Sequence, residues 1–457
     1  MANRVRDLAT PVYLFACLIL GGSSQGIWAN MILQLVGLGL IAWAALAPAT
    51  ERLPGPQRRL LGLIILGLLV VALQLLPLPA TLWSSLGPRQ VLADGYRVLG
   101  IAVPSLPLSL APYDSLTAIL ATIPAIAVIA SAFRLGCRPL WLAIALIIGT
   151  VAGILLGALQ VSSADPSISP WYLYEETNIG VATGFFANAN HMAILLVIAL
   201  PFLAAILAGA SAKGRNVQRY SAVVALTAGA ALVVAVGIAL NGSLAGYGLA
   251  APVMVASAAM LLPGRSPAVR WLAPVAGLLL IGAVGWLATT PLSSRASLQE
   301  SAATSVSSRQ DILDTSLKAA KDFMPLGSGI GTFRQVYALT EDHDRLDPST
   351  YVNHAHDDYV ELALETGIPG LIVLALFLLW WGRAAWRAWT AREADPFARA
   401  AAVASAAILL HSAVDFPLRT AAVSACFAMC LALLVRQRPP PPAGKSDLRP
   451  TRHVVVS

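Results

Sequence analysis

Apolar runs of close to twenty residues recur along most of this chain, and they limit the folds available to it. They are rich in Leu, Ala, Val and Ile, and each is long enough to cross a hydrocarbon core of roughly 30 Å as a helix. The sequence is 57% hydrophobic and only 12% charged, which is far more apolar than an ordinary soluble domain. Ten-residue segments of alternating polarity, typical of an outer-membrane barrel, do not occur. The pattern predicts an all-α bundle of transmembrane helices.

About twelve membrane spans are predicted from these runs. We place them at 11–28, 29–47, 60–76, 115–133, 140–161, 189–209, 220–240, 245–262, 271–289, 368–386, 398–416 and 418–435. One long hydrophilic segment interrupts the series before the tenth span. The chain is therefore divided into spans one to nine (1–289), a hydrophilic helical loop (290–367), spans ten to twelve (368–435) and a disordered, proline-rich tail (436–457).

Basic residues indicate the orientation of the bundle. If the N-terminus is cytoplasmic, most Lys and Arg residues fall in short inner loops or in the tail, as multi-pass proteins require. Both termini are then cytoplasmic, and loop 290–367 lies on the outer side. The net charge of +7 follows from this asymmetry, so it does not indicate nucleic-acid binding. The four cysteines lie in apolar spans or a short inner loop, a pattern that predicts neither disulfides nor a zinc cluster.

The densest group of titratable residues lies at the end of the hydrophilic loop. Residues 353–361 are Asn-His-Ala-His-Asp-Asp-Tyr-Val-Glu. Titratable groups clustered at a membrane boundary are typical of an active site or a transport site. A neutral His354 or His356, oriented by Asp357 or Asp358, is a candidate general base for a sugar hydroxyl. Metal binding is a weaker alternative, because a catalytic site needs three protein ligands. The third alternative is that these residues only cap a helix.

Two helices are predicted within the loop. The first is expected to begin at a capping-box variant formed by Ser308 and Asp311 and to end near Asp322. The second is expected to begin near His356 and to end at Gly367. Each would carry candidate site residues in its first turn.

Arg309 would then occupy the first turn of the first helix. Unpaired backbone N–H groups and a fixed guanidinium at that position make a suitable pocket for phosphate or pyrophosphate. An ordinary exposed arginine is the alternative. The glycine-rich residues 327–331 are expected to form a turn after this helix rather than a phosphate cradle.

Further polar residues are expected at the same outer face. Asn188, Asn190 and His191 lie where the sixth span begins, and His411 and Asp415 lie near the outer end of the eleventh. Ionisable groups are costly in lipid, so they should face the interior of the bundle. They either contribute to the site or form a His–Asp pair that ties two helices together.

Four motifs, in this order, resemble those of the O-antigen ligase and polymerase superfamily. They are residues 184–191 (Gly-Phe-Phe-Ala-Asn-Ala-Asn-His), residues 308–311 (Ser-Arg-Gln-Asp), residues 325–329 (Pro-Leu-Gly-Ser-Gly), and residues 354–361 followed by Gly367 and Gly370. The resemblance covers about residues 180–420. It implies a bacterial inner-membrane protein with twelve spans and a large periplasmic loop.

This resemblance also implies an activity. Members are metal-independent, inverting glycosyltransferases without a cofactor, and they transfer a glycan from undecaprenyl diphosphate to an acceptor hydroxyl. Arg309 matches the loop arginine that holds the pyrophosphate, and His356 matches the histidine that serves the acceptor. The other residues expected to bind substrate are Arg334, His354, Asp357, Asp358, Asn188, Asn190, His191, His411 and Asp415.

The acceptor decides which member of the family this is. Lipid A core would make it an O-antigen ligase, which we favour slightly. Another carrier-linked repeat would make it a polymerase of O-antigen or exopolysaccharide, and a protein Ser or Thr would make it an oligosaccharyltransferase. A multi-pass transporter is the alternative from outside the family.

One departure from the family pattern concerns a second arginine. Members usually carry a Ser-Arg-Gly element at the outer end of the seventh or eighth span. The corresponding residues here are 241–246, Asn-Gly-Ser-Leu-Ala-Gly, with Leu244 where the arginine is expected. Arg334 and Arg419 are candidates to replace that phosphate contact.

Overall fold

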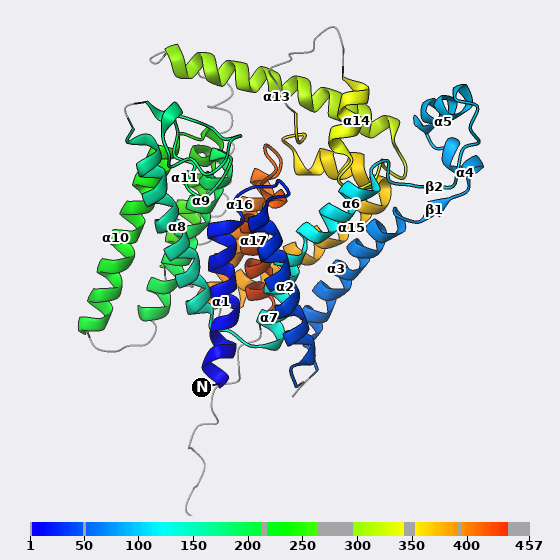
Figure 1. Ribbon diagram of the computed structural model, residues 1–457. Helices are drawn as coiled ribbons and strands as arrows, with labels where there is room; N and C mark the ends of the chain where they lie inside the picture. Colours follow the sequence, from blue (N-terminus) through cyan, green and yellow to red (C-terminus); the bar gives the residue numbers. More distant parts are fainter. Residues whose placement is uncertain are drawn as a thin grey trace, which may run out of the picture.

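The computed structural model in Figure 1 describes residues 2–48, 52–163, 165–211, 217–262, 296–341, 352–391 and 395–436. These residues are mostly helical, as predicted, and they form one bundle with a layer of helices across one end. The only strands within these ranges are β1 (Pro77–Leu78) and β2 (Leu106–Pro107), which pair antiparallel.

Seven described stretches are long and apolar enough to cross a membrane. They are α2 (Trp28–Leu46), α3 (Gly55–Leu73), α6 with α7 (Pro112–Ala121 and Ile123–Arg134), α8 (Pro139–Val161), α9 (Ala189–Ser211), α10 (Val217–Asn241) and α15 (Asp358–Thr390). Three apolar helices are shorter, namely α11 (Leu244–Ala259), α16 (Pro396–His411) and α17 (Ala421–Leu434). The predicted span at 271–289 lies outside the described residues, so the count of twelve stays a prediction.

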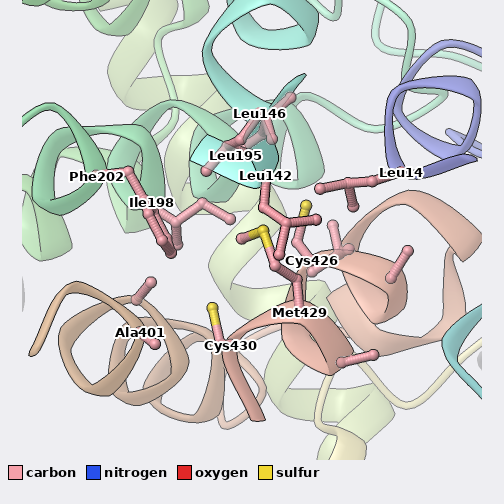
Figure 2. Packing of buried hydrophobic residues seen from close by; sticks show 14 of the residues in the cluster. Leu14, Leu142, Leu146, Leu195, Ile198, Phe202, Ala401, Cys426, Met429 and Cys430 are labelled. Carbon is pink, nitrogen blue, oxygen red and sulfur yellow. The ribbon is translucent and has the colours of Figure 1, made fainter. Parts of the chain in front are cut away.

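The centre of the bundle is formed by α9, α16 and α17. Helix α9 is buried along almost its whole length and packs against α8, α10, α11 and α16. Figure 2 shows Leu195 and Ile198 of α9 directed towards Leu142 of α8 and Met429 of α17, with Phe202 beside Ile198. Lipid is as apolar as these side chains, so close packing holds such helices together. The outer ends of α9 and α16 are thereby fixed relative to each other.

The first helix is shifted from its predicted position. Helix α1 covers Ala2–Leu20. The predicted span at 11–28 is therefore wrong for residues 21–28, which lie beyond the end of this helix. The chain leaves the helix at Gly21 and Gly22, because glycine has low helix propensity. A Cβ on Gly22 would lie 1.9 Å from the carbonyl oxygen of Phe185. The α1–α2 loop therefore packs tightly against the segment that precedes α9.

A layer of helices covers the end of the bundle opposite the N-terminus (Figure 1). It contains α13 (Ala296–Asp322) and α14 (Phe333–Thr340), and both pack on the first turns of α15. A small apolar core that includes Ile312, Phe333 and Leu364 joins these three helices. This separate core explains why the hydrophilic loop folds over the membrane helices.

A second excursion from the bundle, between α3 and α6, was not predicted. It holds the two strands and the helices α4 (Ala80–Ser84) and α5 (Arg89–Val98). Arg89, which is 2% exposed, donates to the carbonyls of Leu108 at 2.6 Å and Gly327 at 3.0 Å. These bonds tie the excursion to the glycine-rich turn after α13.

The first loop helix begins earlier than predicted. Ser308 and Arg309 lie well inside α13 rather than at its start, so the capping-box prediction is wrong. Residues 296–303 contain Ala, Gln and Glu, which continue a helix, and serine is tolerated there at little cost. Arg309 therefore has no unpaired helix-terminal N–H groups beside it. Any anion binding must rely on its guanidinium.

The second loop helix is continuous with a membrane span. Asp357 caps α15, because its carboxylate accepts from the N–H groups of Tyr359 at 2.8 Å and Val360 at 3.0 Å. Gly367 breaks the helical geometry as predicted, with φ 58° and ψ −151°, and helix then resumes into the bundle. A Cβ there would lie 2.2 Å from the carbonyl oxygen of Pro325, so only glycine fits.

Candidate functional site

Three histidine rings surround Phe416 at the end of the bundle where α9 and α15 begin. The distances from the Phe416 ring centroid are 5.0 Å to His191, 4.3 Å to His354 and 5.1 Å to His356. Phe416 is 4% exposed. It lies between α16 and the short 3-10 helix η3 (Pro417–Arg419). The aromatic ring therefore brings together histidines from α9 and from the loop that precedes α15.

Asp415 joins α9 to the end of α16. Its buried carboxylate accepts a hydrogen bond from the Asn190 side chain, and His191 Nε2 lies 3.7 Å away. His411 is on the preceding turn of α16 and is also buried. Within the described part of the chain, neither ring nitrogen of His191 or His411 has a hydrogen-bond partner. Asp415 therefore ties the end of α16 to α9 through Asn190 and His191, and not through a hydrogen bond with His411.

The α10–α11 turn supports this group through its own polar side chains. Ser243 donates to Asn190 Oδ1 at 2.7 Å and caps α11 by accepting from the N–H of Gly246. Asn241 donates to the carbonyls of Ala182 and Ala189, at 2.8 and 2.9 Å. Leu244, in contrast, is 36% exposed. The α10–α11 turn therefore braces the start of α9.

The segment before α9 is held by α8. Gln160 Oε1 accepts from the backbone N–H groups of Thr183 at 2.9 Å and Gly184 at 2.8 Å. Asn188 accepts from the N–H of Asn190 at 2.8 Å and so caps the first turn of α9. These bonds explain why the motif at 184–191 is rich in glycine and asparagine: its backbone and amides build the turn that orients His191.

Arg419 lies among three carboxylates from one face of α15. Its nitrogens are 3.6 Å from Asp358, 3.2 Å from Glu361 and 3.1 Å from Glu365. Burial alone would lower the pKa of this guanidinium, but the three carboxylates raise it above its ordinary value. Arg419 is therefore paired within its own chain, which argues against the idea that it replaces the missing phosphate contact.

The same carboxylates position neighbouring backbone. Glu361 Oε1 lies 2.9 Å from His354 Nδ1, and Oε2 accepts from the N–H of Ala355 at 2.9 Å. Glu365 Oε1 accepts from the N–H groups of Gly331 and Phe333, at 2.8 and 3.4 Å. The glycine-rich residues therefore form a turn closed by the chain's own carboxylate.

His356 has the features of a neutral general base. Its backbone φ is +53°, which is uncommon outside glycine and occurs mainly where surrounding structure enforces it. Its Nδ1 lies 3.1 Å from the carbonyl oxygen of His354. A carbonyl only accepts, so Nδ1 carries the proton and Nε2 is the basic nitrogen.

The surroundings keep His356 uncharged. Burial lowers its pKa below the ordinary value, the charge of Asp415 opposes this shift, and the positive charge of Arg309 adds to it. Arg309 on α13 is half-buried, and its positive charge is felt at His356. Arg334 is exposed on α14, in the outer layer.

Two cavities adjoin this region. One, of about 230 Å³, is polar and includes His191, His356 and Phe416 in its lining. The other, of about 400 Å³, lies among α3, α6, α7, α15 and α17, and its lining includes Val71, Ile126 and Phe377. Sequence reasoning identified the histidines but missed Phe416 and the loop residues that line the polar cavity. The run Gly-Gly-Ser-Ser-Gln at residues 21–25 was the available signal.

Comparison with known proteins locates a family segment in this structure. Residues 229–375 match the family Wzy_C, described as O-antigen ligase. No curated protein matches the chain. The matched segment includes Arg309 and His356, whereas His191 and Asp415 lie beyond its ends. The family match confirms the resemblance seen in the motifs: residues 229–375 of this multi-pass membrane protein are similar to the O-antigen ligase superfamily.

Proposed function

We propose that this protein is a glycosyltransferase of the O-antigen ligase type in the bacterial inner membrane. It transfers a glycan from undecaprenyl diphosphate to a hydroxyl of lipid A core on the periplasmic side. The observation that carries the proposal is the neutral base His356 within reach of the charge of Arg309. Both residues belong to the family segment, and α13, which carries Arg309, lies in the helix layer at one end of the bundle (Figure 1).

The two residues have complementary roles in a single displacement. His356 Nε2 takes the proton of the acceptor hydroxyl as its oxygen attacks the anomeric carbon. The bond from that carbon to the lipid diphosphate breaks, and negative charge grows on the leaving oxygen. The guanidinium of Arg309 stabilises this charge. Attack from the opposite face inverts the anomeric centre without a covalent intermediate.

The apolar cavity among α3, α6, α7, α15 and α17 supports a lipid-linked donor. Its described lining holds no charged side chain, and it includes Leu68, Leu374 and Phe427. An isoprenoid chain is apolar throughout and suits such a surface. Thr366 and Ile330 lie in the same lining, next to Glu365 and the glycine-rich turn. The cavity thus extends from the membrane helices towards the outer layer, where the diphosphate would lie.

A reconstituted assay tests this proposal. The purified protein is incubated with undecaprenyl-diphosphate-linked glycan and EDTA, with or without lipid A core. Product on lipid A core supports the ligase, and chain growth on the carrier alone would identify a polymerase instead. Transfer only to protein Ser or Thr would identify an oligosaccharyltransferase. Absence of turnover with every acceptor, together with movement of a solute across the vesicle membrane, would replace the proposal with a transporter.

Replacing Arg309 with alanine should lower kcat/KM for the donor by about 10²–10³, because one stabilising contact to the leaving group is lost. Initial rates in the reconstituted assay measure this change. Lys318→Ala is the matched control, since Lys318 is an exposed cation on the same helix. Equal losses in the two variants would show that general charge on α13, and not Arg309, matters.

The pH dependence of transfer should reflect the depressed pKa of His356. A general base works in its neutral form, so a lowered pKa extends activity to lower pH. In the profile of kcat against pH, the midpoint of the acid limb is expected below about pH 6.5, the ordinary pKa of histidine. Arg309→Gln, assayed with more enzyme, should move this limb to higher pH, because the positive charge that favours neutral imidazole is gone. An acid limb above 6.5 in the wild type would contradict this assignment.

A further inference from the structure

The polar cavity beside His356 has walls from four distant parts of the chain. Gly22 to Gln25 come from the α1–α2 loop, and Glu176 to Asn178 come from the loop before α9. Asn188 and His191 from the start of α9, with Asn353, His356 and Phe416, complete most of the lining. The cavity therefore lies directly against the candidate base.

These walls are fixed to one another by backbone hydrogen bonds. The N–H of Ala187 donates to the carbonyl of Gly22 at 3.1 Å, and the N–H of Ala422 donates to Gly21 at 3.0 Å. Asn178 Oδ1 accepts from the N–H of Ala189 at 2.9 Å. The loops are thus anchored to α9 and α17, so the cavity has a preformed shape.

The chemistry of the lining suits a neutral polyol. It offers serine and threonine hydroxyls, asparagine and glutamine amides, one carboxylate and an aromatic ring. Among its described lining residues there is no Lys or Arg. Two buried atoms in the lining, His191 Nδ1 and Thr177 Oγ1, lack a hydrogen-bond partner in the described structure, whereas His191 Nε2 lies 3.7 Å from Asp415. Buried polar groups are normally paired, so these atoms point to a polar ligand.

The size of the cavity limits what can enter it. Pockets for drug-sized ligands measure roughly 300–1,000 Å³, whereas this cavity is about 230 Å³. One sugar ring is a suitable occupant, and a disaccharide is too large to be enclosed. A phosphorylated or carboxylated sugar would meet Glu176 with no cationic side chain in the lining to compensate.

We propose that this cavity binds one uncharged sugar residue of the acceptor and presents its hydroxyl to His356. The inference deepens the proposed function. It rests on that function because only a transferase has an acceptor substrate. The donor's first sugar is the alternative occupant. The donor's sugar is attached to the diphosphate, which needs a cation nearby. The cationic Arg309 does not belong to the lining, so the acceptor sugar is the better match.

A filling variant tests the position of the acceptor. Ser24→Trp places a large ring in the cavity and should raise KM for a neutral glycan acceptor at least about tenfold, with KM for the lipid-linked donor unchanged. Ser85→Trp is the matched control, since Ser85 is exposed in the α4–α5 excursion and does not line the cavity. A rise in the donor KM alone would overturn the inference in favour of the donor's sugar.

A charge variant tests selectivity without filling the cavity. Glu176 lines the cavity and is exposed to solvent, so the Glu176→Lys variant should fold normally. The wild type should use an acceptor ending in a hexose in preference to its uronate counterpart. Glu176→Lys should reduce that preference about tenfold. An unchanged preference would overturn the assignment of charge selectivity to this cavity.

A binding measurement tests the sugar site independently of transfer activity. Saturation-transfer NMR with a methyl hexoside and with hexose 6-phosphate is recorded on the full-length protein in detergent. The methyl hexoside should bind to the wild type and not to Ser24→Trp, and the phosphate should bind weakly to both. Binding without transfer in any assay would support the sugar site and overturn the proposed function. Normal transfer with equal binding in wild type and Ser24→Trp would overturn the sugar site and leave the function intact.

Discussion

Replacing His356 with alanine should reduce kcat for glycan transfer by about 10²–10⁴, the usual contribution of a general base. The basic Nε2 is lost, while Arg309 and the apolar cavity for the lipid remain. KM for the donor should therefore change little. Initial rates at saturating donor and acceptor, with protein reconstituted in liposomes, measure the effect.

The unusual backbone of His356 calls for a second variant. Its φ of +53° is tolerated by asparagine better than by alanine. His356→Asn should show the same loss of kcat with an unfolding temperature close to that of the wild type. Added imidazole should restore part of the rate to His356→Gly, since the base is then supplied from solution. Wild-type rates in His356→Asn would remove His356 from the mechanism.

The membrane helices were predictable because apolar length is a strong physical signal. Most predicted spans have a helix in the structure. The helix ends were less predictable, because they depend on tertiary contacts. Gly22 ends α1 where the chain must approach the backbone of Phe185. Ser308 resembles a cap in sequence but lies inside α13, where the preceding residues extend the helix.

The candidate site was partly predictable for a similar reason. Ionisable residues at a membrane boundary are rare and costly, so His356, His191 and Asp415 stood out in an apolar chain. Phe416 did not, because one more aromatic residue carries no signal in such a sequence. Its role depends on contacts with His191, more than two hundred residues away. The same applies to Ser24 and Glu176, whose loops meet only in the folded protein.

Arg419 shows that a sequence reveals a cation but not the carboxylates that pair with it in the folded protein. The sequence left it as a possible phosphate ligand, because it is a cation near the outer face. Its partners Glu361 and Glu365 are more than fifty residues earlier, and their carboxylates lie 3.2 and 3.1 Å from its guanidinium. The two interpretations predict different outcomes when the arginine is removed.

Replacing Arg419 with alanine should destabilise the protein by about 3–5 kcal/mol, the cost of leaving buried charges without their partner. Glu361 and Glu365 are 1% and 0% exposed, so water cannot replace the guanidinium. Thermal unfolding in detergent, followed by size-exclusion chromatography, should show a clear loss of folded protein.

The matched control is the double variant Arg419→Gln with Glu365→Gln, which removes one charge of each sign. It should recover part of the stability that Arg419→Gln alone loses, because fewer carboxylates remain unpaired. Arg419→Lys should be intermediate, since a single ammonium cannot bridge three carboxylates as a planar guanidinium does. If Arg419→Ala instead unfolded like the wild type and raised KM for the donor, Arg419 would be the second phosphate contact. The carboxylates of α15 would then hold it in place for that role, and the loss of arginine at Leu244 would be compensated from η3.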